Sequence, residues 1–285
     1  MFVVAGATGQ VGGVTARTLL ARGADVRVIL RDDTQASPWL QRGAEVAVGN
    51  LGDAEFLATR LTGAEGFFTL LPLDLSSSDV HGDQKKLSDS IGSGVADSGI
   101  PHVVLLSSHG AEHPEGTGPV ACMHYLEDLL HRTAPSVTML RSGYRQENLG
   151  PILPLARAQG ILPSWIPAEV PVRMVAARDV GTVAADSLLA SPGQADVVDI
   201  QGPWYSMTEV AGKLGAALGR QLAVLEIPPA DRVQAFRQAG MSPQVAESFA
   251  EMYAALDAGR FTPAGDRFIE GTTPIDVVIQ DLMLA

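Results

Sequence analysis

The sequence has a single cysteine, few lysines and few aromatic side chains, and it has no long apolar run. Cys122 is the single cysteine among 285 residues, so no intramolecular disulfide can form, and we expect a reducing, cytoplasmic setting. Proline, glycine or charge interrupts each apolar stretch well before the roughly 20 residues that a membrane-spanning helix needs. The N-terminus lacks the basic segment and longer apolar stretch of a signal peptide, so we expect no export signal.

Positive charge is also scarce. The chain carries 20 Lys and Arg against 32 Asp and Glu, which gives a formal net charge of -12, and the pI is about 4.8. The resulting negative field repels phosphate backbones and anionic lipid surfaces. We therefore expect neither nucleic acid nor a membrane as a partner.

Short apolar runs alternate with helical patterns through the first half of the chain. The runs show little in-out alternation, as is typical of parallel strands that are covered on both faces. Val11 to Arg22 is predicted to be a crossover helix that Gly23 closes. The sequence thus predicts an α/β fold, a Rossmann-type doubly wound parallel sheet. Its six expected strands are Phe2 to Ala5, Val26 to Leu30, Glu45 to Val48, Gly66 to Leu71, His102 to Leu106 and Ser136 to Leu140.

The texture changes after about residue 150, where prolines punctuate a segment that cannot hold a long helix. We predict that the Rossmann-type domain spans residues 1–150 and that a smaller lobe, which mostly encloses a ligand cleft at the edge of the sheet, spans 151–285. One segment of the lobe, about 175–202, is expected to return to the main sheet. Ser206 and Glu209 have the spacing of a capping box, which predicts a helix that runs to Gly219.

A glycine-rich turn lies between the first expected strand and the first helix, over Gly6-Ala7-Thr8-Gly9-Gln10-Val11-Gly12. Glycines there permit a tight turn, let main-chain N–H groups approach a pyrophosphate, and allow close packing of helix on sheet. A tight turn without a ligand is the alternative. The strand and helix on either side favour a dinucleotide site, with Gly6, Thr8, Gly9, Gln10 and Val11 in contact with the cofactor.

The residue after the second strand is Arg31, where an NAD-selective site usually has an acidic side chain. A guanidinium can pair with a 2′-phosphate and stack on adenine, which favours NADP(H). Asp32 and Asp33 follow directly, and either can instead meet the ribose. The ends of the next two strands give four further cofactor contacts, namely Asn50, Leu51, Leu70 and Leu71, although Asn50 fits a simple turn equally well.

These motifs recur in the order found in the NmrA-like atypical short-chain dehydrogenase/reductases, which the chain resembles. The remaining matches are Gly49-Asn50-Leu51-Gly52-Asp53, Ser107-Ser108-His109-Gly110, Glu127, Leu140-Arg141-Ser142-Gly143-Tyr144, Glu147-Asn148-Leu149 and Ala177-Arg178-Asp179-Val180-Gly181. The family includes quinone reductases, NADP-sensing regulators and an atypical ketoreductase of angucyclinones from antibiotic biosynthesis. The resemblance implies NADP(H) as cofactor, a small aromatic substrate and a homodimer.

The chain departs from the parent superfamily because it has no Tyr-x-x-x-Lys pair, the usual source of the proton. Ser107 and Ser108 close the fifth strand and can polarise a carbonyl, with turn formation as the alternative. His124 stands about where relatives have the lysine. His109 and His113 are further possible proton donors. Tyr144 and Asn148 follow the sixth strand and can wall the nicotinamide pocket, or simply pack there.

A substrate can also provide its own proton, when a phenol beside the carbonyl is hydrogen bonded to it. Apolar side chains of the second half can enclose flat rings, although ordinary core packing is the alternative for each of Leu73, Leu153, Ile161, Leu162 and Trp165. We predict an NADPH-dependent reductase of a ketone or quinone on a polycyclic aromatic substrate. The alternatives are a general quinone oxidoreductase and a sensor that binds NADP without turnover.

Overall fold

An eight-stranded parallel sheet forms the centre of the protein in the computed structural model, which describes residues 1–191, 193 and 195–284. The strand order is β13-β10-β6-β5-β4-β1-β2-β3. The strands are β1 (Phe2–Ala5), β2 (Val26–Leu30), β3 (Glu45–Val48), β4 (Gly66–Leu70), β5 (Val103–Ser108), β6 (Val137–Ser142), β10 (Asp196–Gln201) and β13 (Arg267–Glu270). The chain therefore has the Rossmann-type arrangement predicted from its sequence.

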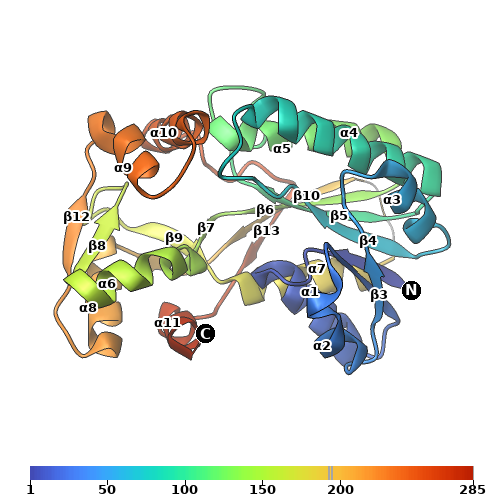
Figure 1. Ribbon diagram of the computed structural model, residues 1–285, viewed down its shortest axis with the longest axis horizontal. Helices are drawn as coiled ribbons and strands as arrows, with labels where there is room; N and C mark the ends of the chain where they lie inside the picture. The colour runs from blue at the N-terminus through green and yellow to red at the C-terminus, as the bar shows by residue number, and fades with distance from the viewer. Residues whose placement is uncertain (192, 194, 285) are drawn as a thin grey trace.

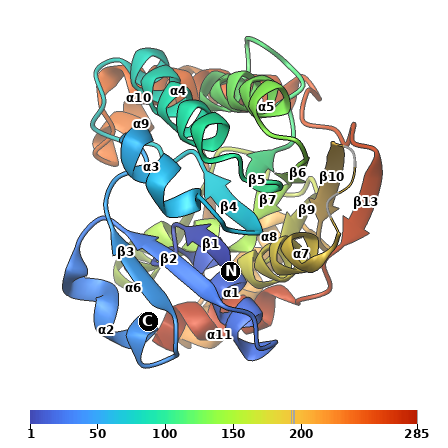
Figure 2. The ribbon, with the colours of Figure 1, turned by 90° about the vertical axis from the view of Figure 1, so that its right-hand side faces the viewer.

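Helices cover both faces of this sheet, as Figure 2 shows. On one face lie α3 (Ala54–Leu61), α4 (Val80–Ser98) and α5 (Ala121–Thr133), and on the other lie α1 (Gln10–Ala21) and α7 (Ala177–Leu189). Successive residues of β1 point to opposite faces, so Val3 packs in the core under α3 to α5 and Val4 in the core under α1 and α7. Burial on both faces explains why the strands are almost purely apolar.

The rest of the chain forms a lobe at the carboxyl ends of the strands, on the left of Figure 1. Its core is apolar and includes Leu153, Leu162 and Phe236. In the described part of the chain, no helix is long and apolar enough to cross a membrane. The lobe contains β7 (Tyr144–Arg145), β8 (Ile161–Ser164), β9 (Val172–Val175), β11 (Trp204–Tyr205), β12 (Ala223–Glu226), α6 (Leu153–Gln159), α8 (Met207–Leu218), α9 (Arg232–Gln238), α10 (Pro243–Asp257) and α11 (Ile275–Leu284). The chain also forms short helices, some of them outside the lobe. They are η1 (Asp33–Gln35) and α2 (Ala36–Leu40) between β2 and β3, η2 (Gly118–Val120) before α5, and η3 (Gln146–Ile152) and η4 (Pro229–Asp231) in the lobe.

The six predicted strands are all present, with ends shifted by at most two residues. The capping box of α8 is also present, since Ser206 accepts from the Glu209 N–H and Glu209 accepts from the Ser206 N–H. Only one later segment, about 175–202, is predicted to return to the main sheet, but two later strands, β10 and β13, belong to it. The added strand, β13, is a four-residue edge strand with Arg267 and Glu270 at its ends, a pattern that gives little strand signal.

Candidate cofactor and active site

The turn after β1 has the shape that a bound pyrophosphate requires. Gly6 has φ of 64° and its carbonyl accepts the Gly9 N–H at 2.9 Å. A Cβ at Gly12 would lie 2.4 Å from the Gly6 carbonyl oxygen, so only glycine lets α1 approach β1 this closely. Gly9 caps α1 without a side-chain hydrogen bond, which leaves the first N–H groups of the helix available to an anion. The turn therefore fits a dinucleotide pyrophosphate.

Two more of the predicted contacts in this turn, Thr8 and Gln10, are exposed beside that helix end. Val11 is only 3% exposed and belongs to the core between α1 and the sheet. Its side chain is therefore unavailable, and any contact of Val11 with the pyrophosphate would come from its main-chain N–H.

Arg31 is exposed directly after β2 and forms no ion pair within the described chain. Asp32, the competing acid, is the N-cap of η1, where its carboxylate accepts hydrogen bonds from the Thr34 N–H and hydroxyl. These hydrogen bonds lower the pKa of Asp32. One oxygen of the Asp32 carboxylate is thus used within its own turn, and the exposed Arg31 guanidinium is available to a 2′-phosphate.

The remaining predicted cofactor contacts at β3 and β4 differ in what their side chains do. The Asn50 side-chain oxygen accepts the Gly52 N–H at 2.9 Å, so it builds a turn while its amide nitrogen stays available. The Leu70 side chain covers Gly6, where an added Cβ would lie 2.7 Å from Cδ2. Leu51 and Leu71 pack with the core under α3 to α5. Of the three leucines, Leu70 thus shapes the cofactor turn most directly.

Ser107 belongs to a buried charge network. Its hydroxyl donates to Glu127 Oε1 at 2.6 Å, and Arg141 donates to both oxygens of the same carboxylate at 3.0 and 2.6 Å. A third bond runs from Arg141 to Glu112 at 3.2 Å. Ser107 is 3% exposed, and its hydroxyl proton is committed to a carboxylate. A substrate carbonyl would have to compete with Glu127 for that proton.

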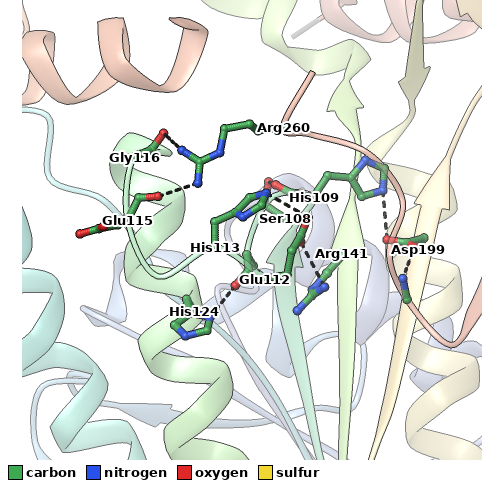
Figure 3. Close-up of polar contacts among 12 residues, drawn as sticks. Ser108, His109, Glu112, His113, Glu115, Gly116, His124, Arg141, Asp199 and Arg260 are labelled. Atoms are coloured by element: carbon green, nitrogen blue, oxygen red, sulfur yellow. Dashed lines mark hydrogen bonds and ion pairs between the residues drawn. The ribbon is translucent and has the colours of Figure 1, made fainter. Parts of the chain in front are cut away.

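Ser108 is the half-buried last residue of β5, and its hydroxyl donates only to the main-chain oxygen of His109. His109 itself is buried, with Nε2 3.4 Å from Oδ1 of Asp199 on β10 (Figure 3). Burial lowers the pKa of His109, and the nearby carboxylates of Asp199 and Glu112 oppose this effect. Nothing in the sequence linked His109 to a residue 90 positions away.

The other two histidines considered as proton donors, His113 and His124, lie in or beside the loop between β5 and α5. His124 is half-buried on α5 and its Nδ1 is 2.9 Å from the Ala111 carbonyl, so it is a donor at this nitrogen and has Nε2 free. His113 Nε2 is 3.6 Å from Glu112. A Tyr–Lys contact does occur elsewhere, between Tyr125 and Lys85 at 3.1 Å, but the Tyr125 hydroxyl donates to Asp89 on α4.

Tyr144 and the residues after it connect the sheet to the lobe. Burial raises the pKa of Tyr144, while hydrogen bonds with Tyr253 and Asn148 oppose the increase. The neighbouring Gln146 donates to the carbonyls of Met174 and Thr273, and Glu147 accepts the Ala177 N–H at 2.8 Å. Gln146 and Glu147 therefore have a structural role, because they join this part of the chain to the segments around residues 174–177 and 273.

Among the apolar residues expected around flat rings, Leu153 and Leu162 are instead buried in the lobe core, at 5% and 0% exposure. Leu73, Ile161 and Trp165 remain half-buried. Trp165 stacks on Phe236 with centroids 5.1 Å apart and planes 8° apart, and Tyr253 lies beside both rings. The lobe thus contains an aromatic cluster that the sequence analysis identified only through Trp165.

Residues 1–281 match the NmrA-like family. An NAD(P)H azoreductase from Xenophilus azovorans is 26% identical over 259 residues, which cover 89% of this chain and 86% of the relative.

Two solved structures share the fold. An NADPH-dependent quinone oxidoreductase of Escherichia coli, complexed with NADPH, has a TM-score of 0.80 at 20% identity, and the match covers 99% of this chain and 100% of the other. The triphenylmethane reductase of Citrobacter sp., complexed with NADP(H), gives the same TM-score, identity and coverage. Both likenesses extend through the lobe as well as the sheet.

Proposed function

The chain belongs to the NmrA-like family, and from this premise we propose that it is an NADPH-dependent reductase of a ketone or quinone carbonyl on a polycyclic aromatic substrate. Bound NADPH supplies the hydride. The glycine turn holds its pyrophosphate and Arg31 holds its 2′-phosphate. The single cysteine supports a reducing, cytoplasmic setting, and the family resemblance supports a homodimer.

The observation that carries the proposal is the difference between the hydrogen-bond acceptors of the two serine hydroxyls at the end of β5. The Ser108 hydroxyl is engaged only by a neighbouring main-chain oxygen, whereas that of Ser107 is held by Glu127. Ser108 can therefore turn its proton toward a substrate carbonyl and stabilise the negative charge that develops on the oxygen. We assign the polarising role to Ser108 and a structural role to Ser107.

Hydride addition to the carbonyl carbon leaves an alkoxide that needs a proton. In a substrate with an adjacent phenol, the phenolic O–H breaks as the new alcohol O–H forms, and the phenolate then takes a proton from water. The protein group that we propose as the alternative donor is His124 in its imidazolium form, which gives the alkoxide the proton on Nε2 and keeps the Nδ1–H bonded to the Ala111 carbonyl. Tyr144 is a poorer donor, because burial raises its pKa.

The aromatic character of the substrate is supported by what the relatives are named for. Their names refer to azo compounds, quinones and triphenylmethane dyes, and the last two classes are flat or aryl-rich molecules. In the lobe, Trp165 is half-buried and stacks on the buried Phe236, so only the Trp165 ring is left partly accessible to such a molecule. Resemblance to an angucyclinone ketoreductase extends the proposal to a polyketide-type substrate of antibiotic biosynthesis.

NADPH consumption by the purified protein tests this proposal, with simple quinones and with polycyclic aromatic ketones that have or lack a phenol beside the carbonyl. We expect turnover of the phenol-bearing ketones, faster with NADPH than with NADH. Turnover of simple quinones alone would indicate a general quinone oxidoreductase. Tight NADPH binding without oxidation by any acceptor would favour the NADP sensor.

A further inference from the structure

Residues 258–266, here called the strap, join α10 of the lobe to β13 of the sheet. They cross the loop of residues 109–120 that connects β5 to α5, here called the β5–α5 loop. Figure 3 shows Arg260 reaching from the strap to this loop, and Asp199 lying beneath the strap. The strap thus brings a remote part of the sequence to the edge of the candidate active site.

Arg260 holds the outer end of the β5–α5 loop. Its guanidinium donates to the carbonyls of Glu115 and Gly116, each at 3.0 Å. Gly116 has φ of 73°, and a Cβ added there would lie 2.4 Å from Arg260 Nη1. The guanidinium therefore lies in the space that a side chain at position 116 would need.

The loop has little local support at this point. In the described structure its main-chain turn and loop hydrogen bonds run from the N–H groups of His109, Ala111, His113 and Val120 to the carbonyls of Ser142, Ser108, Gly110 and Thr117, and none involves residues 114–116. Arg260 is therefore the group that satisfies carbonyls in this stretch. Charged donors make stronger hydrogen bonds than neutral ones, so these two bonds can fix the loop.

Two further contacts hold the inner end of the loop. The Phe261 ring covers Gly110, where an added Cβ would lie 3.0 Å from the ring. Gly265 donates its N–H to Asp199 Oδ2 at 2.6 Å, and the other oxygen of that carboxylate faces His109. The strap therefore contacts the loop near its start, at Gly110 directly and at His109 through Asp199, and again in its middle, at 115–116.

We propose that Arg260 is a positioning residue for carbonyl reduction, acting through the β5–α5 loop. This inference rests on the function proposed above. The loop starts directly after Ser108, and Ala111 within it binds the ring of His124. A loop held by Arg260 presents these two groups in one arrangement toward the substrate, which lowers the cost of reaching the productive geometry. The glycine turn and Arg31 follow β1 and β2, which β4 separates from β5, so we expect the contacts to the pyrophosphate and the 2′-phosphate to persist when Arg260 is removed.

The experiment compares Arg260→Ala, Arg260→Lys and Arg220→Ala with the wild type. Arg220 is the matched control, because its guanidinium also donates to a main-chain carbonyl, that of Arg157, but within the lobe. For an acceptor that the wild type reduces, we expect Arg260→Ala to lower kcat/KM about tenfold, which corresponds to a charged hydrogen bond. Hydrogen exchange over residues 113–118 should become faster, while the Kd for NADPH stays within about twofold.

Arg260→Lys should recover part of the activity, since an ammonium can still bind one carbonyl. Unchanged kcat/KM and unchanged loop exchange in Arg260→Ala would overturn the proposal, as would an equal effect of Arg220→Ala. If the wild type reduces no acceptor, the proposed function fails separately. The role in carbonyl reduction then falls with it, and loop exchange decides only whether Arg260 fixes the loop: faster exchange in Arg260→Ala supports this and unchanged exchange refutes it.

Discussion

Two regions meet at the carboxyl edge of the sheet, and different kinds of interaction hold them in place. The cofactor turn after β1 is fixed by its own main chain, through Gly6, Gly12 and the start of α1. The β5–α5 loop is contacted by side chains from elsewhere in the chain, namely His124 of α5, Arg141 of β6, Asp199 of β10 and Arg260 of the strap. The turn should therefore tolerate almost no added atom, whereas the loop should respond in graded steps as distant side chains are removed.

The largest effect is expected from Gly12→Ala, which places a Cβ against the main chain of both Gly6 and Ala5, at 2.4 and 2.6 Å from their oxygens. Neither atom can move without opening the turn, so we expect NADPH affinity to fall at least about 100-fold. Cofactor fluorescence measures it. The control is Gly212→Ala on α8, where nothing lies within 4 Å, and which should stabilise the protein by about 0.5 to 1 kcal/mol. Retained affinity in Gly12→Ala would refute a rigid turn.

The next largest effect is expected in the buried network of Ser107, Glu127 and Arg141 beside the β5–α5 loop. Glu127→Gln leaves the Arg141 guanidinium, which is 9% exposed, without its main anion, and we expect a loss of about 3 kcal/mol in the free energy of unfolding. Chemical denaturation measures it. The adjacent Asp128 pairs with Arg132 at the surface, with both side chains 60% exposed, so Asp128→Asn should change stability by less than about 0.5 kcal/mol. Equal losses would show that burial of the pair is unimportant.

Arg31→Ala should have a smaller effect than Gly12→Ala and should act on one cofactor only. Loss of a charged hydrogen bond to the 2′-phosphate predicts a Kd for NADPH about 10- to 100-fold higher, with the Kd for NADH changed less than about threefold. Titration of both cofactors checks this. Equal losses for the two cofactors would remove Arg31 from phosphate recognition.

The smallest effect concerns pH. Burial lowers the pKa of His102 and of His109 in the folded protein, so the unfolded chain binds these protons more readily. Their contribution to stability is present above the unfolded pKa of about 6.5 and is lost as the pH falls below it. Urea unfolding at neutral and mildly acidic pH should show this loss. His109→Gln should reduce it and the exposed His131→Gln should not; the reverse pattern would contradict the assignment.

The contrast between the two regions also explains what could be predicted from the sequence. The glycine turn and the first six strands are encoded in contiguous residues, so their patterns were sufficient to predict them, while the contact of Arg31 with the 2′-phosphate stays a prediction. The edge strand β13 was missed because its four residues include two charges and gain their register only from β10. The Asp32 carboxylate accepts a hydrogen bond from Thr34, two residues further along the chain, and this short-range pattern could have been recognised in the sequence.

The loop side is different, because its geometry depends on pairs far apart in the chain. His109 faces Asp199 and Glu115 faces Arg260, and no spacing rule connects either pair. For the two serines, strand geometry requires that Ser107 and Ser108 point to opposite faces, so only one can face a given site. The sequence pattern could not tell which of the two serines has a free hydroxyl, because that depends on Glu127 of α5, which accepts the hydrogen bond of Ser107.

The most direct test of the central claim is the comparison of Ser107→Ala with Ser108→Ala, measuring kcat/KM for a phenol-bearing polycyclic ketone and the free energy of unfolding of each variant. We predict that Ser108→Ala lowers kcat/KM about 10- to 100-fold with stability unchanged, and that Ser107→Ala mainly lowers stability, by about 1 to 3 kcal/mol. If Ser107→Ala abolished turnover and Ser108→Ala did not affect it, the assignment of the polarising role to Ser108 would be wrong.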